Sequence, residues 1–170
     1  MEVLVLVADD NDEDRQRISD MIVELGYRPA TAIDGPTAIE RIQEQIPDVA
    51  LIDVSLPGKT CTEVLDAMRA DPVLRQIPVI VLADADEEQH VVSSIGKGAD
   101  DYLIKPFNPL LLKARVAASL DRRVFFERAA TYRREIEEYN LTLEEHVREQ
   151  VEEISSTQLA TIFAMSKLAE

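Results

Sequence analysis

The sequence is poor in metal-binding and disulfide-forming residues, in basic residues and in long apolar runs. With one cysteine and two histidines it can form neither an intramolecular disulfide nor an ordinary zinc site. Basic residues number 18 against 33 acidic ones, and this charge of −15 argues against binding to a nucleic-acid backbone. No apolar run approaches the roughly 18 residues of a membrane span, and the N-terminus lacks the basic stretch of a signal peptide. We therefore expect a cytoplasmic protein with neither nucleic acid nor membrane as a partner.

Glycine and proline are missing from the last part of the chain. All five glycines lie at or before Gly98 and all eight prolines at or before Pro109, so residues 110–170 contain no residue that interrupts a helix. Hydrophobic residues make up 46% of the chain, which is enough for a packed core. We predict a compact domain over residues 1–122, followed over residues 123–170 by a long helix that leads to a further unit absent from this sequence.

Short apolar runs rich in β-branched residues recur through the compact part. They lie at residues 3–8, 49–52, 79–83 and 102–104, with a weaker run at residues 28–33. Such runs are typical of strands in a parallel sheet that is covered on both faces. Between them apolar residues recur at helical spacing, as in the stretch from Ile18 to Leu25, which stops at Gly26. Five β-then-α units predict an α/β fold with a doubly wound parallel sheet.

Charged side chains stand where these runs end. Asp9 and Asp10 follow the run at residues 3–8, and Asp53 follows the run at residues 49–52. Ala83 and Asp84 stand at the end of the run at residues 79–83, and Lys105 follows the run at residues 102–104. Because ligands bind outside the carboxyl ends of parallel strands, we expect the carboxylates of Asp9, Asp10 and Asp53 and the ammonium group of Lys105 to meet at one edge. Clustered carboxylates repel one another unless a cation neutralises them, and their oxygens suit Mg²⁺. Such a carboxylate can also attack phosphorus and form an aspartyl phosphate.

Four segments around these residues resemble the receiver domain of bacterial two-component response regulators. The segments are VLVADD at 5–10, LIDVSLPG at 51–58, PVIVL at 78–82 and GADDYLIKPF at 98–107. The resemblance covers about residues 1–120 and implies a flavodoxin-like five-stranded sheet with the strand order 2-1-3-4-5. It also implies Mg²⁺ as the cofactor, a sensor histidine kinase as the partner, and the role of a phosphoacceptor rather than an enzyme.

The same resemblance assigns a role to individual residues. Asp53 corresponds to the phosphoacceptor, Lys105 to the lysine that contacts the phosphoryl group, and Tyr102 to the aromatic switch position. Asp9 and Asp10 correspond to the acidic pair that binds Mg²⁺, with Asp10 as the direct ligand. The implied metal site thus comprises Asp9, Asp10, Asp53 and the backbone carbonyl of Ser55.

Three positions depart from the receiver pattern. Ala83 stands where receivers carry threonine or serine, so the hydroxyl that would bond the phosphoryl group is missing. Asp84 replaces the small residue that usually follows. Cys61 stands in place of a glycine, and we interpret it as a small packing residue rather than a reactive thiol. The loss of the hydroxyl predicts a weakened coupling between phosphorylation and Tyr102.

Other functions stay open from the sequence. A degenerate receiver would act only as a phosphorylation-independent dimerisation platform, which Ala83 and Asp84 favour. An aspartyl-phosphate phosphohydrolase on a similar sheet needs a second aspartate two residues after the nucleophile, where this chain has Ser55. A flavin-binding module would have to place a phosphate beside the acidic turn after the first strand.

The segment after residue 122 has the pattern of a coiled coil. Apolar residues fit a heptad seam at Ile136, Leu143, Val147 and Ile154, with Asn140 and Gln150 at the other seam positions. Residues 132, 143, 154 and 165 also repeat every 11 positions, a spacing typical of straighter or right-handed coils. Because such a helix cannot bury its stripe alone, we predict a parallel homodimer. Residues 161–170 resemble the helix that leads into HD-GYP cyclic-di-GMP phosphodiesterase domains, although the chain has no His-Asp pair for that catalysis.

Overall fold

A computed structural model describes residues 2–168 of the chain, without the side chains of residues 126, 127 and 168. The last two residues of the segment that resembles an HD-GYP lead helix, Ala169 and Glu170, lie outside the described residues. Contacts divide the chain into a first unit that ends at Val124 and a second unit that begins at Phe125. We describe each unit by itself.

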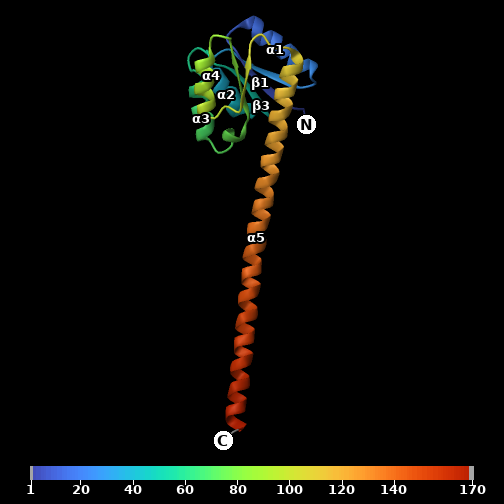
Figure 1. Ribbon diagram of the computed structural model, residues 1–170, viewed down its shortest axis with the longest axis vertical. Helices are drawn as coiled ribbons and strands as arrows, with labels where there is room; N and C mark the ends of the chain where they lie inside the picture. The colour runs from blue at the N-terminus through green and yellow to red at the C-terminus, as the bar shows by residue number, and fades with distance from the viewer. Residues whose placement is uncertain (1, 169–170) are drawn as a thin grey trace. The chain divides into compact units, whose positions relative to one another are not determined.

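The first unit is built on a sheet of five parallel strands (Figure 1). The strands are β1 Leu4–Ala8, β2 Arg28–Ala32, β3 Val49–Asp53, β4 Val79–Ala83 and β5 Asp101–Ile104, in the order β2-β1-β3-β4-β5. The edge strand β2 contains Pro29, which donates no hydrogen bond and is tolerated at an edge. The predicted α/β fold and strand order are confirmed.

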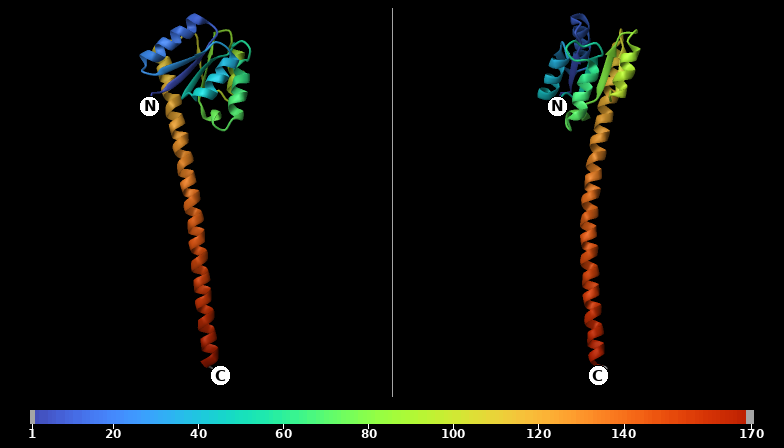
Figure 2. Two further views of the ribbon diagram at one scale, coloured as in Figure 1. Left: turned by 180° about the vertical axis from the view of Figure 1, so that it is seen from behind. Right: turned by 90° about the vertical axis from the view of Figure 1, so that its left-hand side faces the viewer.

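Helices cover both faces of this sheet (Figure 2). They are α1 Asp12–Glu24, α2 Gly35–Gln45, α3 Cys61–Ala70, the short 3-10 helix η1 Leu74–Gln76, α4 Glu88–Gly96 and α5 Pro109–Leu168. The part of α5 up to residue 124 belongs to the first unit. Successive β1 residues alternate between two cores: Leu6 packs with side chains of α2 and α3, and Val7 with side chains of α1 and α5. This period-two alternation explains why the strand is apolar at every position.

Side-chain caps fix where the helices begin and so where the connecting loops end. The Asn11 side chain accepts the backbone N–H groups of Glu13 and Asp14 at the start of α1. Thr60 and Glu63 form a reciprocal capping box at the start of α3. These caps hold the loops after β1 and β3, which carry the acidic residues of the site.

The second unit consists of the part of α5 from residue 125 onward. Every side chain from residue 128 to residue 167 is exposed, including the seam residues Ile136 (60% exposed), Val147 (51%) and Ile154 (58%). A single copy of this helix therefore buries none of its apolar stripe. Over the described residues, no helix is both long and apolar enough to span a membrane.

Candidate functional site

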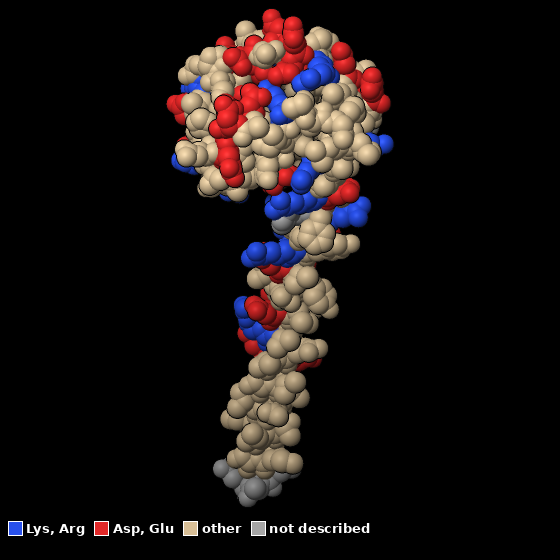
Figure 3. All heavy atoms as spheres, turned by 45° about the horizontal axis from the view of Figure 1, so that its top comes forward, with Lys and Arg blue, Asp and Glu red and all other residues tan. Residues whose placement is uncertain are grey.

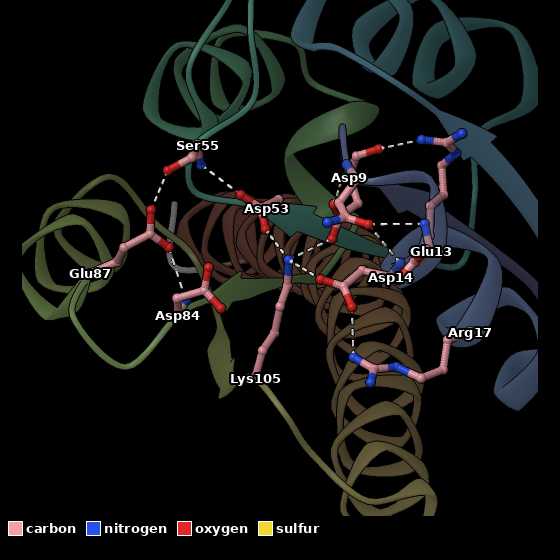
Figure 4. Close-up of polar contacts among 11 residues, drawn as sticks. Asp9, Glu13, Asp14, Arg17, Asp53, Ser55, Asp84, Glu87 and Lys105 are labelled. Atoms are coloured by element: carbon pink, nitrogen blue, oxygen red, sulfur yellow. Dashed lines mark hydrogen bonds and ion pairs between the residues drawn. The ribbon is translucent and has the colours of Figure 1, made fainter.

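Lys105 stands between two buried carboxylates at the carboxyl end of the sheet (Figure 4). Its Nζ lies 2.5 Å from Asp53 Oδ2 and 2.7 Å from Asp9 Oδ2. Asp9 ends up here because it follows β1, Asp53 because it ends β3, and Lys105 because it follows β5. All three side chains are buried, and Asp9 is fully so. The structure thus brings together three of the predicted site residues.

The charges of Asp53 and Lys105 depend on each other. Burial raises the pKa of the Asp53 carboxyl above its ordinary value, although hydrogen bonds from Lys105 and from the backbone of Ser55 oppose the rise. Burial alone would lower the pKa of Lys105, but its hydrogen bonds to Asp53 and Asp9 outweigh burial and raise it. The lysine is therefore a fixed positive charge that neutralises only part of the acidic cluster.

The two residues of the acidic pair have different surroundings. Asp9 is buried, and its Oδ1 accepts the Asn11 N–H at 2.9 Å while its backbone carbonyl accepts Arg15 Nη1 at 2.9 Å. Asp10 is exposed, and its carboxylate forms no hydrogen bond with any described residue. Asp9 is thus held in place by the protein, whereas Asp10 is free to take a ligand from solution.

The expected metal cluster is not assembled in the structure. Among the described residues, no three side chains of His, Cys, Asp or Glu are grouped to hold a metal ion. The Lys105 ammonium group lies between the carboxylates of Asp9 and Asp53. The donor set still suits Mg²⁺, because each Asp53 oxygen accepts one hydrogen bond, from Ser55 or from Lys105, and retains a further lone pair.

The charge of the surrounding surface favours a cation as well. Acidic side chains crowd the end of the first unit where the site lies (Figure 3). A concentration of one sign of charge attracts counter-ions and repels anions. This end of the first unit therefore attracts cations and repels free anions.

Ala83 and Tyr102 take the places that the strand pattern predicts. Ala83 is fully buried at the end of β4, and its backbone carbonyl accepts the Lys105 N–H at 2.8 Å. The side chain at this position is a methyl group, which cannot donate a hydrogen bond. Tyr102 is 45% exposed and borders a pocket that α4 residues Val92 and Ile95 also line.

Sequence reasoning missed two carboxylates near the site. Asp14 Oδ2 lies 3.5 Å from Lys105 Nζ, and its other oxygen pairs with Arg17 at 2.7 Å. Glu87 accepts the hydroxyl of Ser55 and the N–H of Asp84. Asp14 follows Asp10 by four residues and Glu87 follows Asp84 by three. This spacing is a weak signal, because it does not tell which of several neighbouring acidic side chains turns inward.

Cys61 has the surroundings of a packing residue. Its thiol is buried at the start of α3, and burial raises its pKa to about 12. A thiol with such a pKa is protonated at neutral pH and therefore a poor nucleophile.

Comparison with known proteins identifies relatives of the first unit. A model of the response regulator receiver domain family matches residues 5–117. The phosphate regulon transcriptional regulatory protein PhoB of Escherichia coli K12 is 33% identical over 118 residues, which are 69% of this chain and 52% of PhoB. The response regulator PleD of Caulobacter vibrioides is 33% identical over 116 residues, 68% of this chain and 26% of PleD. The chain thus spans about half the length of one relative and a quarter of the other.

Solved structures resemble the same part of the chain. A putative response regulator from Chloroflexus aurantiacus aligns with a TM-score of 0.68 and 28% identity, covering 71% of this chain and 99% of that one. The receiver domain of the sensor histidine kinase PA1611 from Pseudomonas aeruginosa aligns with a TM-score of 0.67 and 26% identity, again over 71% and 99%. That structure holds a magnesium ion coordinated in its active-site cleft.

Proposed function

The chain belongs to the response regulator receiver family of two-component systems, and on this premise we propose that Asp53 accepts a phosphoryl group from a sensor histidine kinase. The observation that carries the proposal is the contact of Asp53 with Lys105, 2.5 Å between oxygen and nitrogen, at the buried end of β3. A receiver domain is not generally counted as an enzyme, although its own residues promote the transfer. It would act in the cytoplasm, where the kinase presents its phosphohistidine.

The transfer is a displacement at phosphorus. A carboxylate oxygen of Asp53 forms the new P–O bond while the P–N bond to the donor histidine breaks, and the electron pair of that bond stays on the imidazole. Lys105, already charged and in contact with Asp53, pairs with an oxygen of the incoming group. Asp9 orients Lys105 through its own 2.7 Å contact.

Mg²⁺ would supply the remaining positive charge in this acidic site. Asp10, Asp53 and the backbone carbonyl of Ser55 would hold it, with Asp9 beside them. This assignment is supported by the exposed, unbonded carboxylate of Asp10 and by the magnesium ion reported in the PA1611 receiver.

The two residues of the acidic pair should differ in their effect on metal binding. Asp10→Ala removes the direct ligand, so we expect Mg²⁺ affinity to fall roughly tenfold or more. Asp9→Ala changes the net charge equally but leaves the ligand in place, so its effect should be smaller. Isothermal titration calorimetry on the unphosphorylated protein measures both. Equal affinities in the two variants and the wild type would refute the role of Asp10.

The wild-type protein provides the test of the proposed function. Incubation with acetyl phosphate and Mg²⁺ should add one phosphoryl group by intact mass, and a chelator in place of Mg²⁺ should prevent the addition. An unchanged mass under both conditions would instead favour the alternative of a degenerate receiver that serves as a dimerisation platform. The phosphohydrolase alternative loses support because Ser55, which replaces its second aspartate, offers a hydroxyl bonded to Glu87 rather than a carboxyl group.

The missing hydroxyl at position 83 should limit the response to phosphorylation. Ala83→Thr restores one hydrogen bond to a charged group, worth about 1.5–3 kcal/mol, in the phosphorylated state alone. We expect a larger phosphorylation-dependent change in the NMR signals of Tyr102. Ala83→Val, which has the shape of threonine without the hydroxyl, is the matched control for added volume at this buried position. If the two variants respond alike, the hydroxyl is not what limits the switch.

We also propose that the second unit forms a parallel dimer that carries the signal to an output domain. In the heptad frame, Val147 and Ile154 fall at a positions and Leu143 at d, a combination that favours two parallel strands. Asn140 also falls at an a position, where a polar residue is known to set register. An HD-GYP phosphodiesterase is our proposal for the output, supported only by the short resemblance of residues 161–170.

A further inference from the structure

Glu87 ties together two loops at the edge of the site. It precedes α4, and one of its carboxylate oxygens accepts the hydroxyl of Ser55 while the other accepts the backbone N–H of Asp84 at 2.9 Å. Ser55 follows the phosphoacceptor strand β3, and Asp84 follows β4. Figure 4 shows this bridge on the opposite side of Asp53 from Asp9 and Asp14. One side chain thus connects the loops that follow two neighbouring strands.

Ser55 couples this bridge to the phosphoacceptor. Its N–H donates to Asp53 Oδ1 at 2.7 Å, and its hydroxyl donates to Glu87. Two carboxylates are therefore held by the same residue. A glutamate carboxylate ordinarily carries a negative charge at neutral pH.

A phosphoryl group on Asp53 would change the balance of this arrangement. It adds about −1.5 to −2 charges at neutral pH, next to the serine that holds the Glu87 carboxylate. Like charges at short range repel, and each hydrogen bond at this exposed place contributes little to hold them together. At the same time Ala83 provides no hydroxyl that would draw the loop after β4 toward the phosphoryl group.

We propose that Glu87 is a latch that holds the loop after β4 in the unphosphorylated protein, and that phosphorylation of Asp53 releases it. The inference rests on the proposed function for its trigger, whereas the latch itself is a property of the unphosphorylated protein. The switch would then work by releasing a loop that is already held, and this release would not require a hydroxyl at position 83.

The resting latch can be tested without phosphorylation. In the full-length protein, hydrogen exchange of the Asp84 amide, followed by NMR, reports the bond that Glu87 accepts. Glu87→Ala should accelerate this exchange about tenfold, because the Asp84 amide then loses one hydrogen bond. Ser55→Ala, which keeps the backbone carbonyl, should accelerate it less. Glu88→Ala, a neighbouring exposed glutamate, is the matched control and should leave the exchange unchanged.

The release is tested by repeating the measurement after phosphorylation with acetyl phosphate and Mg²⁺. The wild-type Asp84 amide should then exchange about as fast as in unphosphorylated Glu87→Ala, which itself should not change further. Glu87→Gln removes the repelling charge but keeps an acceptor, so phosphorylation should accelerate its exchange less than in the wild type.

Two results would overturn the inference. Equal resting exchange in Glu87→Ala and Glu88→Ala would mean that Glu87 holds nothing, and unchanged or slower exchange in the phosphorylated wild type would mean that nothing is released. If the wild type takes up no phosphoryl group, the proposed function and the release fail, while the resting comparison still decides whether Glu87 holds the loop.

Discussion

Asp53→Asn should abolish the Mg²⁺-dependent phosphoryl adduct while leaving the protein folded. The amide oxygen of asparagine can still accept a hydrogen bond from Lys105 or Ser55, but an amide is not a nucleophile toward phosphorus at neutral pH. The buried contact between Lys105 and Asp9 also survives, so the lysine keeps a partner. Intact mass after incubation with acetyl phosphate and Mg²⁺ measures the adduct, and thermal unfolding checks the fold.

A second substitution makes the result specific to position 53. Asp84→Asn removes the same charge from an exposed residue near the site and should leave the adduct in place. An adduct that persists in Asp53→Asn would move the phosphoacceptor to another carboxylate. Asp9 and Asp14 are then the first candidates, because both contact Lys105 as well, at 2.7 and 3.5 Å.

The sheet and its helices were predictable because local patterns determine them. Apolar runs such as residues 49–52 are buried at every position in a strand covered on both faces, and the apolar residues from Ile18 to Leu25 recur with the period of a helix. Strand ends then bring Asp9, Asp53 and Lys105 to one edge as a matter of topology. The order of the strands, by contrast, came from the family resemblance and not from these patterns.

The contacts within the site were less predictable, since they depend on how far side chains reach between loops. The sequence puts Asp10 with Asp9 in one metal group, but the structure exposes Asp10 and places Lys105 between Asp9 and Asp53. The Lys105 ammonium group, at the end of a long side chain, contacts both of these carboxylates. Glu87 was missed for the same reason, because its role depends on a turn that aims it at Ser55.

Removing residues 125–170 should convert a dimer into a monomer. The first unit keeps both of its hydrophobic cores after this truncation, because they are formed by residues up to Leu120. The removed helix carries the exposed apolar stripe, with Leu143 at 47% and Ile136 at 60% exposure, and a second copy of the helix would cover this stripe. Light scattering at micromolar concentration should give the mass of two chains for the full-length protein and of one for the truncated form.

Cysteine cross-linking tests the geometry of the same dimer. Residues at the heptad a positions of two parallel, in-register helices face each other across the seam. Asn140→Cys should therefore form a disulfide between chains under oxidising conditions. Leu141→Cys, one residue further and outside the seam, is the control and should cross-link poorly. The native Cys61 is buried and does not interfere. Two results together would place the interface on the first unit: a truncated protein that remains dimeric, and equal cross-linking at both positions. The exposed side chains of Val92 and Tyr102 are then the first surface to examine.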